Sequence, residues 1–92
     1  MKTFVMLTNL TGEGVKTVKE HPERIKQVNK EVEHLGAKII TQYGLLGPYD
    51  FLTILQTEDE KSMYKIAIEL GARGTLETTT FPAIPIDELI RE

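Results

Sequence analysis

The order in which strand-like and helix-like segments follow one another limits this sequence to few folds. Runs rich in β-branched and apolar residues occupy four places, at residues 3–10, 37–46, 51–56 and 76–81. One amphipathic helical stretch lies between the first and second runs, and another lies between the third and fourth. This β-α-β-β-α-β order predicts an α+β, ferredoxin-like sandwich: a four-stranded antiparallel sheet with both helices on one face. Right-handed crossovers put the first and third strands in the middle of that sheet.

The ends of both predicted helices carry sequence signals. Pro22 suits the first turn of a helix, where its missing N–H needs no partner, and Gly36 marks the end of that helix. Thr57 and Glu60 have the spacing of a capping box and predict the start of the second helix, which Gly71 ends. The apolar stripe of the first helix consists of Ile25, Val28, Val32 and Leu35.

Two connecting segments carry weaker signals. Val15 and Val18 support one short helical turn after the first strand. Pro82 is expected to close the last strand, because it has no N–H to donate to a neighbouring strand. Residues 86–90 then form a short tail with room for one helical turn.

Both faces of the predicted sheet carry apolar side chains. Successive side chains of a strand alternate between faces, so Val5 and Leu7 point one way while Phe4 and Met6 point the other. Only one face can pack against the helices, and the other would expose a large hydrophobic patch to water. We therefore expect a homodimer or higher homo-oligomer formed through stacked sheet faces. The alternative is that the C-terminal tail folds across the open face.

The composition excludes several classes of function. The chain has 92 residues, a net charge of −3, 40% hydrophobic and 27% charged residues, as is ordinary for one domain covering residues 1–92. Nucleic acid and anionic membranes normally require a dense basic face, so neither is expected as a partner. The lack of cysteine excludes disulfides and thiolate metal sites. With no apolar leader before the first strand, the expected location is cytoplasmic.

Few residues are candidates for chemistry. Tyr49 and Asp50 could bind a polar ligand or transfer a proton, although Asp50 equally suits accepting hydrogen bonds within a turn. The other candidates are polar or half-polar residues that either pair with one another or face a cavity. They are Asn9, Tyr43, Arg73, Thr78 and Thr80.

No pattern indicates a metal or a cofactor. Glu31 and His34 have Glu-x-x-His spacing, but a single copy lacks the further carboxylates of a bridged metal site. Gly12 and Gly14 follow a strand without the third glycine of a dinucleotide fingerprint. The sequence therefore predicts no metal and no cofactor, and it identifies no catalytic residue.

Several short segments resemble one known family. The turn at residues 47–50, Gly-Pro-Tyr-Asp, resembles the Gly-x-Tyr-Asp element of GYD-domain proteins. Residues 7–11 and 22–24 resemble that family's first strand and first helix, and residues 70–71 and 77–80 resemble its second helix end and last strand. The resemblance implies ferredoxin-like protomers whose sheets stack in a dimeric α/β-barrel. It implies no activity, because GYD proteins are largely uncharacterised and related barrels include monooxygenases, isomerases and amino-acid-sensing domains.

Three functions are compatible with the sequence. We favour a small-molecule-binding module with its ligand between the sheet and the helices. One alternative is a cofactor-independent enzyme, monooxygenase- or isomerase-like, that acts on a small organic compound; the other is an assembly protein without a ligand. A general base facing a cavity would favour the enzyme, and only Asp50 and His21 qualify. The predicted ligand contacts are Tyr43, Tyr49, Asp50, Asn9, Thr78 and Thr80.

Overall fold

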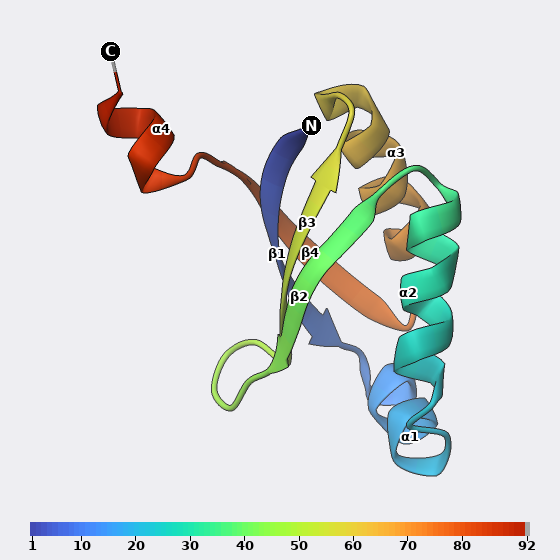
Figure 1. Cartoon of the computed structure of the whole chain (residues 1–92). Helices are drawn as coiled ribbons and strands as arrows, with labels where there is room; N and C mark the ends of the chain where they lie inside the picture. Colours follow the sequence, from blue (N-terminus) through green and yellow to red (C-terminus); the bar gives the residue numbers. More distant parts are fainter. Residues whose placement is uncertain (92) are drawn as a thin grey trace.

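The structure, a computed structural model, describes residues 1–91 and packs a layer of helices on one face of a sheet (Figure 1). In chain order the elements are β1 (Lys2–Leu10), α1 (Gly12–Glu20), α2 (Arg24–His34), β2 (Lys38–Gly44), β3 (Phe51–Thr57), α3 (Glu60–Gly71), β4 (Leu76–Ala83) and α4 (Ile86–Ile90). The strand order is β2-β3-β1-β4, and each neighbouring pair is antiparallel. The predicted ferredoxin-like α+β fold, with the first and third strands in the centre, is confirmed.

The core lies between the sheet and helices α2 and α3. Phe4 of β1 pairs with Leu55 of β3, and both side chains are buried, as is Ile66 of α3. Burying one such side chain contributes about 1.5–3 kcal/mol, so these contacts hold the helices over the central strands. The buried hydrophobic residues of the described chain are Phe4, Met6, Val32, Ala37, Leu55, Met63, Ile66 and Leu70.

The start of α3 differs from the sequence prediction. Asp59 is the N-cap, and its carboxylate accepts a hydrogen bond from the Ser62 backbone N–H at 2.8 Å. Thr57 is wrong as the cap, because it still belongs to β3, where it pairs with Lys2 of β1. Its hydroxyl instead donates to the Asp59 carbonyl oxygen at 2.6 Å and so fixes the turn into the helix.

Helix α1 is longer than the single turn that the sequence predicts. Thr11 caps it by accepting a hydrogen bond from the Gly14 N–H, at 3.2 Å. Thr11 also joins α1 to the loop before β4, because its N–H donates to the Thr75 carbonyl oxygen at 3.0 Å and its hydroxyl donates to Gly74 at 2.9 Å. A Cβ atom on Gly14 would lie 1.9 Å from that Thr75 oxygen, so only glycine allows this contact.

Both outer strands of the sheet are irregular. The pairing register of β2 with β3 shifts between Ile39 and Thr41, which is a β-bulge. Strand β4 continues through Pro82 to Ala83, so the prediction that Pro82 closes the strand is wrong. Proline is tolerated there because β4 lies at the edge of the sheet.

The sheet face away from the helices is apolar, and the C-terminal tail leaves it uncovered. Val5 and Leu7 of β1 pair with Ile54 and Leu52 of β3 on this open face, and Tyr43 of β2 lies opposite Leu52 with 59% of its surface exposed. Figure 1 shows α4 standing away from the body, beyond the end of β4. The open face is therefore hydrophobic surface without cover from the described chain.

Candidate functional site

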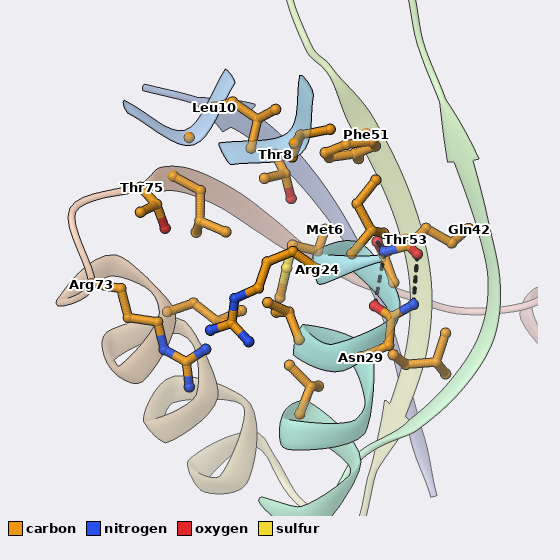
Figure 2. A pocket seen from close by; sticks show the side chains of 18 of the residues that line it. Met6, Thr8, Leu10, Arg24, Asn29, Gln42, Phe51, Thr53, Arg73 and Thr75 are labelled. Carbon is orange, nitrogen blue, oxygen red and sulfur yellow. Dashed lines mark hydrogen bonds between the residues drawn. The ribbon is translucent and has the colours of Figure 1, made fainter. Parts of the chain in front are cut away.

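A cavity of about 330 Å³ lies between the helix-facing side of the sheet and helices α1 and α2 (Figure 2). Its size is at the lower end of small-molecule sites, which range over roughly 300–1,000 Å³. The sheet supplies the apolar floor, with Met6 and Leu10 from β1 and Phe51 from β3, and α2 supplies Ile25 and Val28. Apolar walls of this kind suit the hydrocarbon part of a ligand.

An amide pair lines one side of the cavity. The Asn29 Nδ2 donates to the Gln42 Oε1 at 2.8 Å, and the Gln42 Nε2 donates back to the Asn29 Oδ1 at 3.2 Å. Gln42 also donates to the Thr53 hydroxyl at 2.9 Å. The network connects α2 with strands β2 and β3, so it fixes the distance between helix and sheet at this end.

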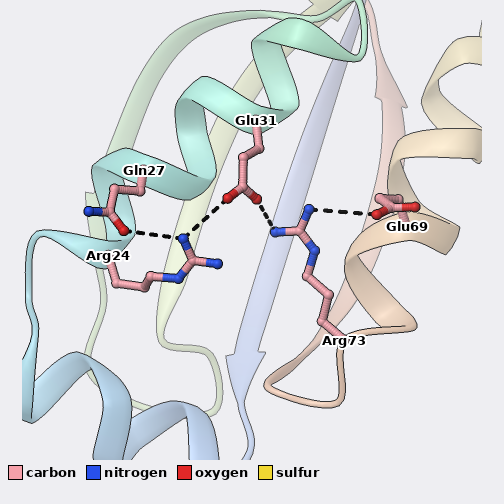
Figure 3. Close-up of polar contacts among 5 residues, drawn as sticks. All are labelled: Arg24, Gln27, Glu31, Glu69 and Arg73. Carbon is pink, nitrogen blue, oxygen red and sulfur yellow. Dashed lines mark hydrogen bonds and ion pairs between the residues drawn. The ribbon is translucent and has the colours of Figure 1, made fainter.

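Two arginines line the opposite side of the cavity in Figure 2. Arg24 is the first residue of α2 and Arg73 lies in the loop between α3 and β4, with 40% and 25% of their side chains exposed. Glu31 of α2 lies between them and accepts from Arg24 Nη1 at 3.1 Å through one oxygen and from Arg73 Nη1 through the other (Figure 3). Glu69 forms a second, longer ion pair with Arg73, at 3.7 Å.

The ionisation of Glu31 follows from these contacts. The hydrogen bond from Arg73 holds the pKa of the Glu31 carboxyl below its usual value of 4.5, and the bond from Arg24 acts in the same direction. Partial burial opposes the shift. Glu31 is therefore ionised at neutral pH and balances part of the positive charge of the two guanidinium groups.

The lining of the cavity contains no proton-transfer group among the described residues. Its polar members are threonines, the two amides and the two arginines, and none of the lining residues is Asp, Glu, His, Lys or Tyr. Arginine stays protonated in proteins, so neither guanidinium can act as a general base. The arrangement suits binding of a ligand better than abstraction of a proton.

The sequence profile described as "GYD domain" matches residues 4–91. The chain belongs to the GYD domain family. A curated relative from Thermus thermophilus, named glutamine synthetase and cystathionine beta-lyase binding protein, is 42% identical over 91 residues, which cover 98% of this chain and 96% of that protein.

Solved structures with much lower sequence identity share the fold. The crystal structure of MtbAldR matches with a TM-score of 0.69 at 16% identity, over 91% of this chain and 52% of that one, so this chain matches about half of that protein's length. An ACT domain protein from Streptococcus pneumoniae matches with a TM-score of 0.56 at 11% identity, over 90% of both chains. At these identities the likeness concerns the ferredoxin-like fold alone.

The Tyr-Asp element of this GYD domain joins the β2–β3 loop to β1. The Asp50 carboxylate accepts a hydrogen bond from the Leu10 N–H at 2.8 Å, and the Asp50 N–H donates to the Thr8 carbonyl oxygen at 2.8 Å. Leu45 donates to the Asp50 carbonyl oxygen, also at 2.8 Å. Tyr49 is half-buried beside it. These contacts hold the end of the hairpin, and neither residue lines the cavity of 330 Å³.

The other predicted contacts lie in two further places. Tyr43 of β2 lies on the open face of the sheet. Asn9 of β1 lies opposite Glu77 of β4. Thr78 and Thr80 line a second cavity of about 220 Å³ between α3 and β4. Of the predicted set, only the two threonines line a cavity together, and a ligand role for all six stays a prediction.

Of the charged residues beside the larger cavity, the sequence singled out only one as a polar candidate. Arg73 is among the polar candidates, but Arg24 and Glu31 are not, although a spacing of seven residues puts them on one face of α2. The contact of Glu31 with Arg73 joins residues 42 positions apart, so only the folded chain reveals it.

The described part of the chain has neither a cluster of metal ligands nor a membrane-spanning helix. Within residues 1–91, no three His, Cys, Asp or Glu side chains gather so that they could hold a metal ion. None of the helices there is both long and apolar enough to cross a bilayer.

Proposed function

We propose that this GYD domain is a small-molecule-binding module whose ligand occupies the cavity between the sheet and helices α1 and α2. The observation that carries the proposal is the lining of the cavity: mostly apolar walls, with amides on one side and arginines on the other. Such a combination of apolar surface and a few oriented polar groups is typical of ligand sites. A cofactor-independent enzyme is a weaker alternative, because the described lining offers no general base.

Native mass spectrometry and thermal melting test this proposal. We expect either a retained mass on the freshly purified protein or a metabolite that raises the melting temperature, because a ligand bound only to the folded state stabilises it. Val28→Phe should fill the cavity and abolish the effect, whereas Lys26→Phe, at an exposed position of the same helix, should preserve it. Lack of any retained mass and of any stabilising compound would contradict the proposal.

A second copy of the chain is proposed to cover the open sheet face. Two such faces stacked on each other would bury Val5, Leu7, Leu52 and Ile54 and give the dimeric α/β-barrel expected from the sequence. Leu52→Lys should yield monomers in native mass spectrometry, because it places a charge in the centre of that interface. Tyr64→Lys, on the exposed surface of α3, is the matched control and should leave the oligomer unchanged. A monomeric wild-type protein would overturn this proposal.

Binding to other proteins is a second candidate function, favoured by the relative from Thermus thermophilus. That relative is named for binding glutamine synthetase and cystathionine beta-lyase, and it is 42% identical over nearly the full length of both chains. Biolayer interferometry with both purified enzymes tests whether the property extends to this chain. If neither enzyme binds while the oligomer is intact, this second candidate function is refuted.

Cytoplasmic location stays a prediction.

A further inference from the structure

We propose, building on the proposed ligand-binding function, that the ligand of the 330 Å³ cavity is a small monocarboxylate whose carboxylate lies between Arg24 and Arg73 and whose apolar body fills the cavity. The charge of the site, the geometry of Glu31 and the apolar floor each support one part of this proposal.

Both ionisable groups of the lining are cationic, while the carboxylates paired with them, Glu31 and Glu69, lie outside the lining. Arg24 and Arg73 are the only ionisable residues among the described residues that line the cavity. A guanidinium carries five N–H donors in a planar fork that matches a carboxylate. Both contacts of Arg24, to Gln27 and to Glu31, use Nη1. Its Nη2 and Nε donors are therefore left for a ligand within the described structure.

Glu31 shows that the gap between the arginines accommodates a carboxylate. Its two oxygens contact the two guanidinium groups separately, Oε1 with Arg24 and Oε2 with Arg73 (Figure 3). The Glu31 side chain is 38% exposed, so it can turn into solvent when a ligand carboxylate takes its place. Partly exposed ion pairs of this kind are weak, which makes the exchange of one carboxylate for another easy.

The apolar side of the cavity determines the rest of the ligand. Met6, Leu10 and Phe51 form the apolar floor, and Leu76 of β4 also lines the cavity. A purely polar anion would leave these surfaces without contact, and a long hydrocarbon would exceed a cavity of about 330 Å³. A short aliphatic or aryl-alkyl acid satisfies both conditions.

Isothermal titration with matched probes tests the proposal. Hexanoate, octanoate and 3-phenylpropanoate are compared with octanamide and octylamine, which keep an apolar body but replace the anion by a neutral or cationic group. We expect at least one acid to bind, octanamide to bind roughly 10-fold more weakly or worse, as the loss of charge-assisted hydrogen bonds implies, and octylamine not to bind.

Variants of the three charged residues separate a binding role from a structural one. Arg24→Gln and Arg73→Gln should each weaken acid binding roughly 10-fold, whereas Glu31→Gln should strengthen it, because the internal competitor is removed. Arg91→Gln, in the exposed tail, removes the same charge and should change nothing. If the arginines only hold Glu31 in place, none of these variants will shift acid affinity while circular dichroism confirms the fold.

The outcomes distinguish the ligand class from the binding function itself. Equal binding of octanamide and octanoate, abolished by Val28→Phe, would overturn the carboxylate assignment and leave the cavity as a ligand site. Failure of every acid to bind would also overturn the assignment, and the metabolite screen would then decide on the ligand-binding function independently.

Discussion

The contact between Gly14 and the Thr75 carbonyl oxygen makes Gly14→Ala the most informative single substitution. The added Cβ would lie 1.9 Å from that oxygen and 3.3 Å from Leu10 Cδ2. The backbone oxygen must therefore move away from α1, which breaks the hydrogen bond from the Thr11 N–H at 3.0 Å and strains the one from its hydroxyl to Gly74.

These contacts determine how much the free energy of unfolding should fall. Two hydrogen bonds contribute about 1 kcal/mol each, and forcing an extra methyl into packed surroundings costs about 1–3 kcal/mol. Alanine recovers up to about 1 kcal/mol through its higher helix propensity. With one bond lost and the other weakened, the net loss of about 1–4 kcal/mol corresponds to a fall in melting temperature of roughly 5–30 °C for a domain of this size.

Thermal unfolding followed by circular dichroism measures the effect against a matched control. Gly12→Ala lies in the first turn of the same helix, and its Cβ would meet nothing within 4 Å, so we expect it to be neutral or slightly stabilising. A Gly14→Ala protein that melts within about 3 °C of Gly12→Ala would refute the reasoning, since such a gap corresponds to less than 1 kcal/mol.

Three further substitutions test individual contacts. The Glu31→Gln protein should be less stable than the wild type at neutral pH. Folding lowers the pKa of Glu31, mainly through the hydrogen bond from Arg73, so the ionised carboxylate stabilises the folded state and protonation removes that stabilisation. The difference in stability should therefore shrink as the pH falls below the usual carboxyl pKa of 4.5. An equal difference in melting temperature at pH 7 and pH 3 would argue against this. Asp50→Asn should cost about 1 kcal/mol in urea unfolding, because a neutral acceptor binds the Leu10 N–H less strongly, and should leave ligand affinity unchanged; lost affinity with unchanged stability would favour a ligand role. Thr80→Val should raise stability by about 1 kcal/mol, because the buried Thr80 hydroxyl has no hydrogen-bond partner among the described residues; a lower melting temperature would show that the hydroxyl is bonded in solution.

The fold could be predicted from the sequence because its main signals are local. Apolar spacing distinguishes strands from helices, and element order then fixes the sheet topology. The errors occur where a contact distant in sequence decides. Thr57 is a residue type that often caps helices, but here it pairs with Lys2 in the sheet. The start of α1 depends on Thr11 and Gly14, which contact the loop at Thr75.

The candidate site was less predictable, since its groups come from separate parts of the chain. A ligand between sheet and helices was expected, and a cavity lies there, yet Tyr43 and Tyr49 do not line it. Its polar groups are an amide pair and two arginines that meet only through folding, as Glu31 and Arg73 do. A polar residue on a predicted strand does not reveal which other side chains line the same cavity.

The irregular edges of the sheet have a consequence for solubility at high concentration. An exposed edge strand offers unpaired N–H and C=O groups on which another chain can pair, and this is how many β-proteins aggregate. Here one edge, β4, carries Pro82, which has no N–H to offer, and the other edge, β2, is interrupted by the bulge between Ile39 and Thr41. Both features hinder the addition of further strands at the edges of the sheet, even though its open face is apolar.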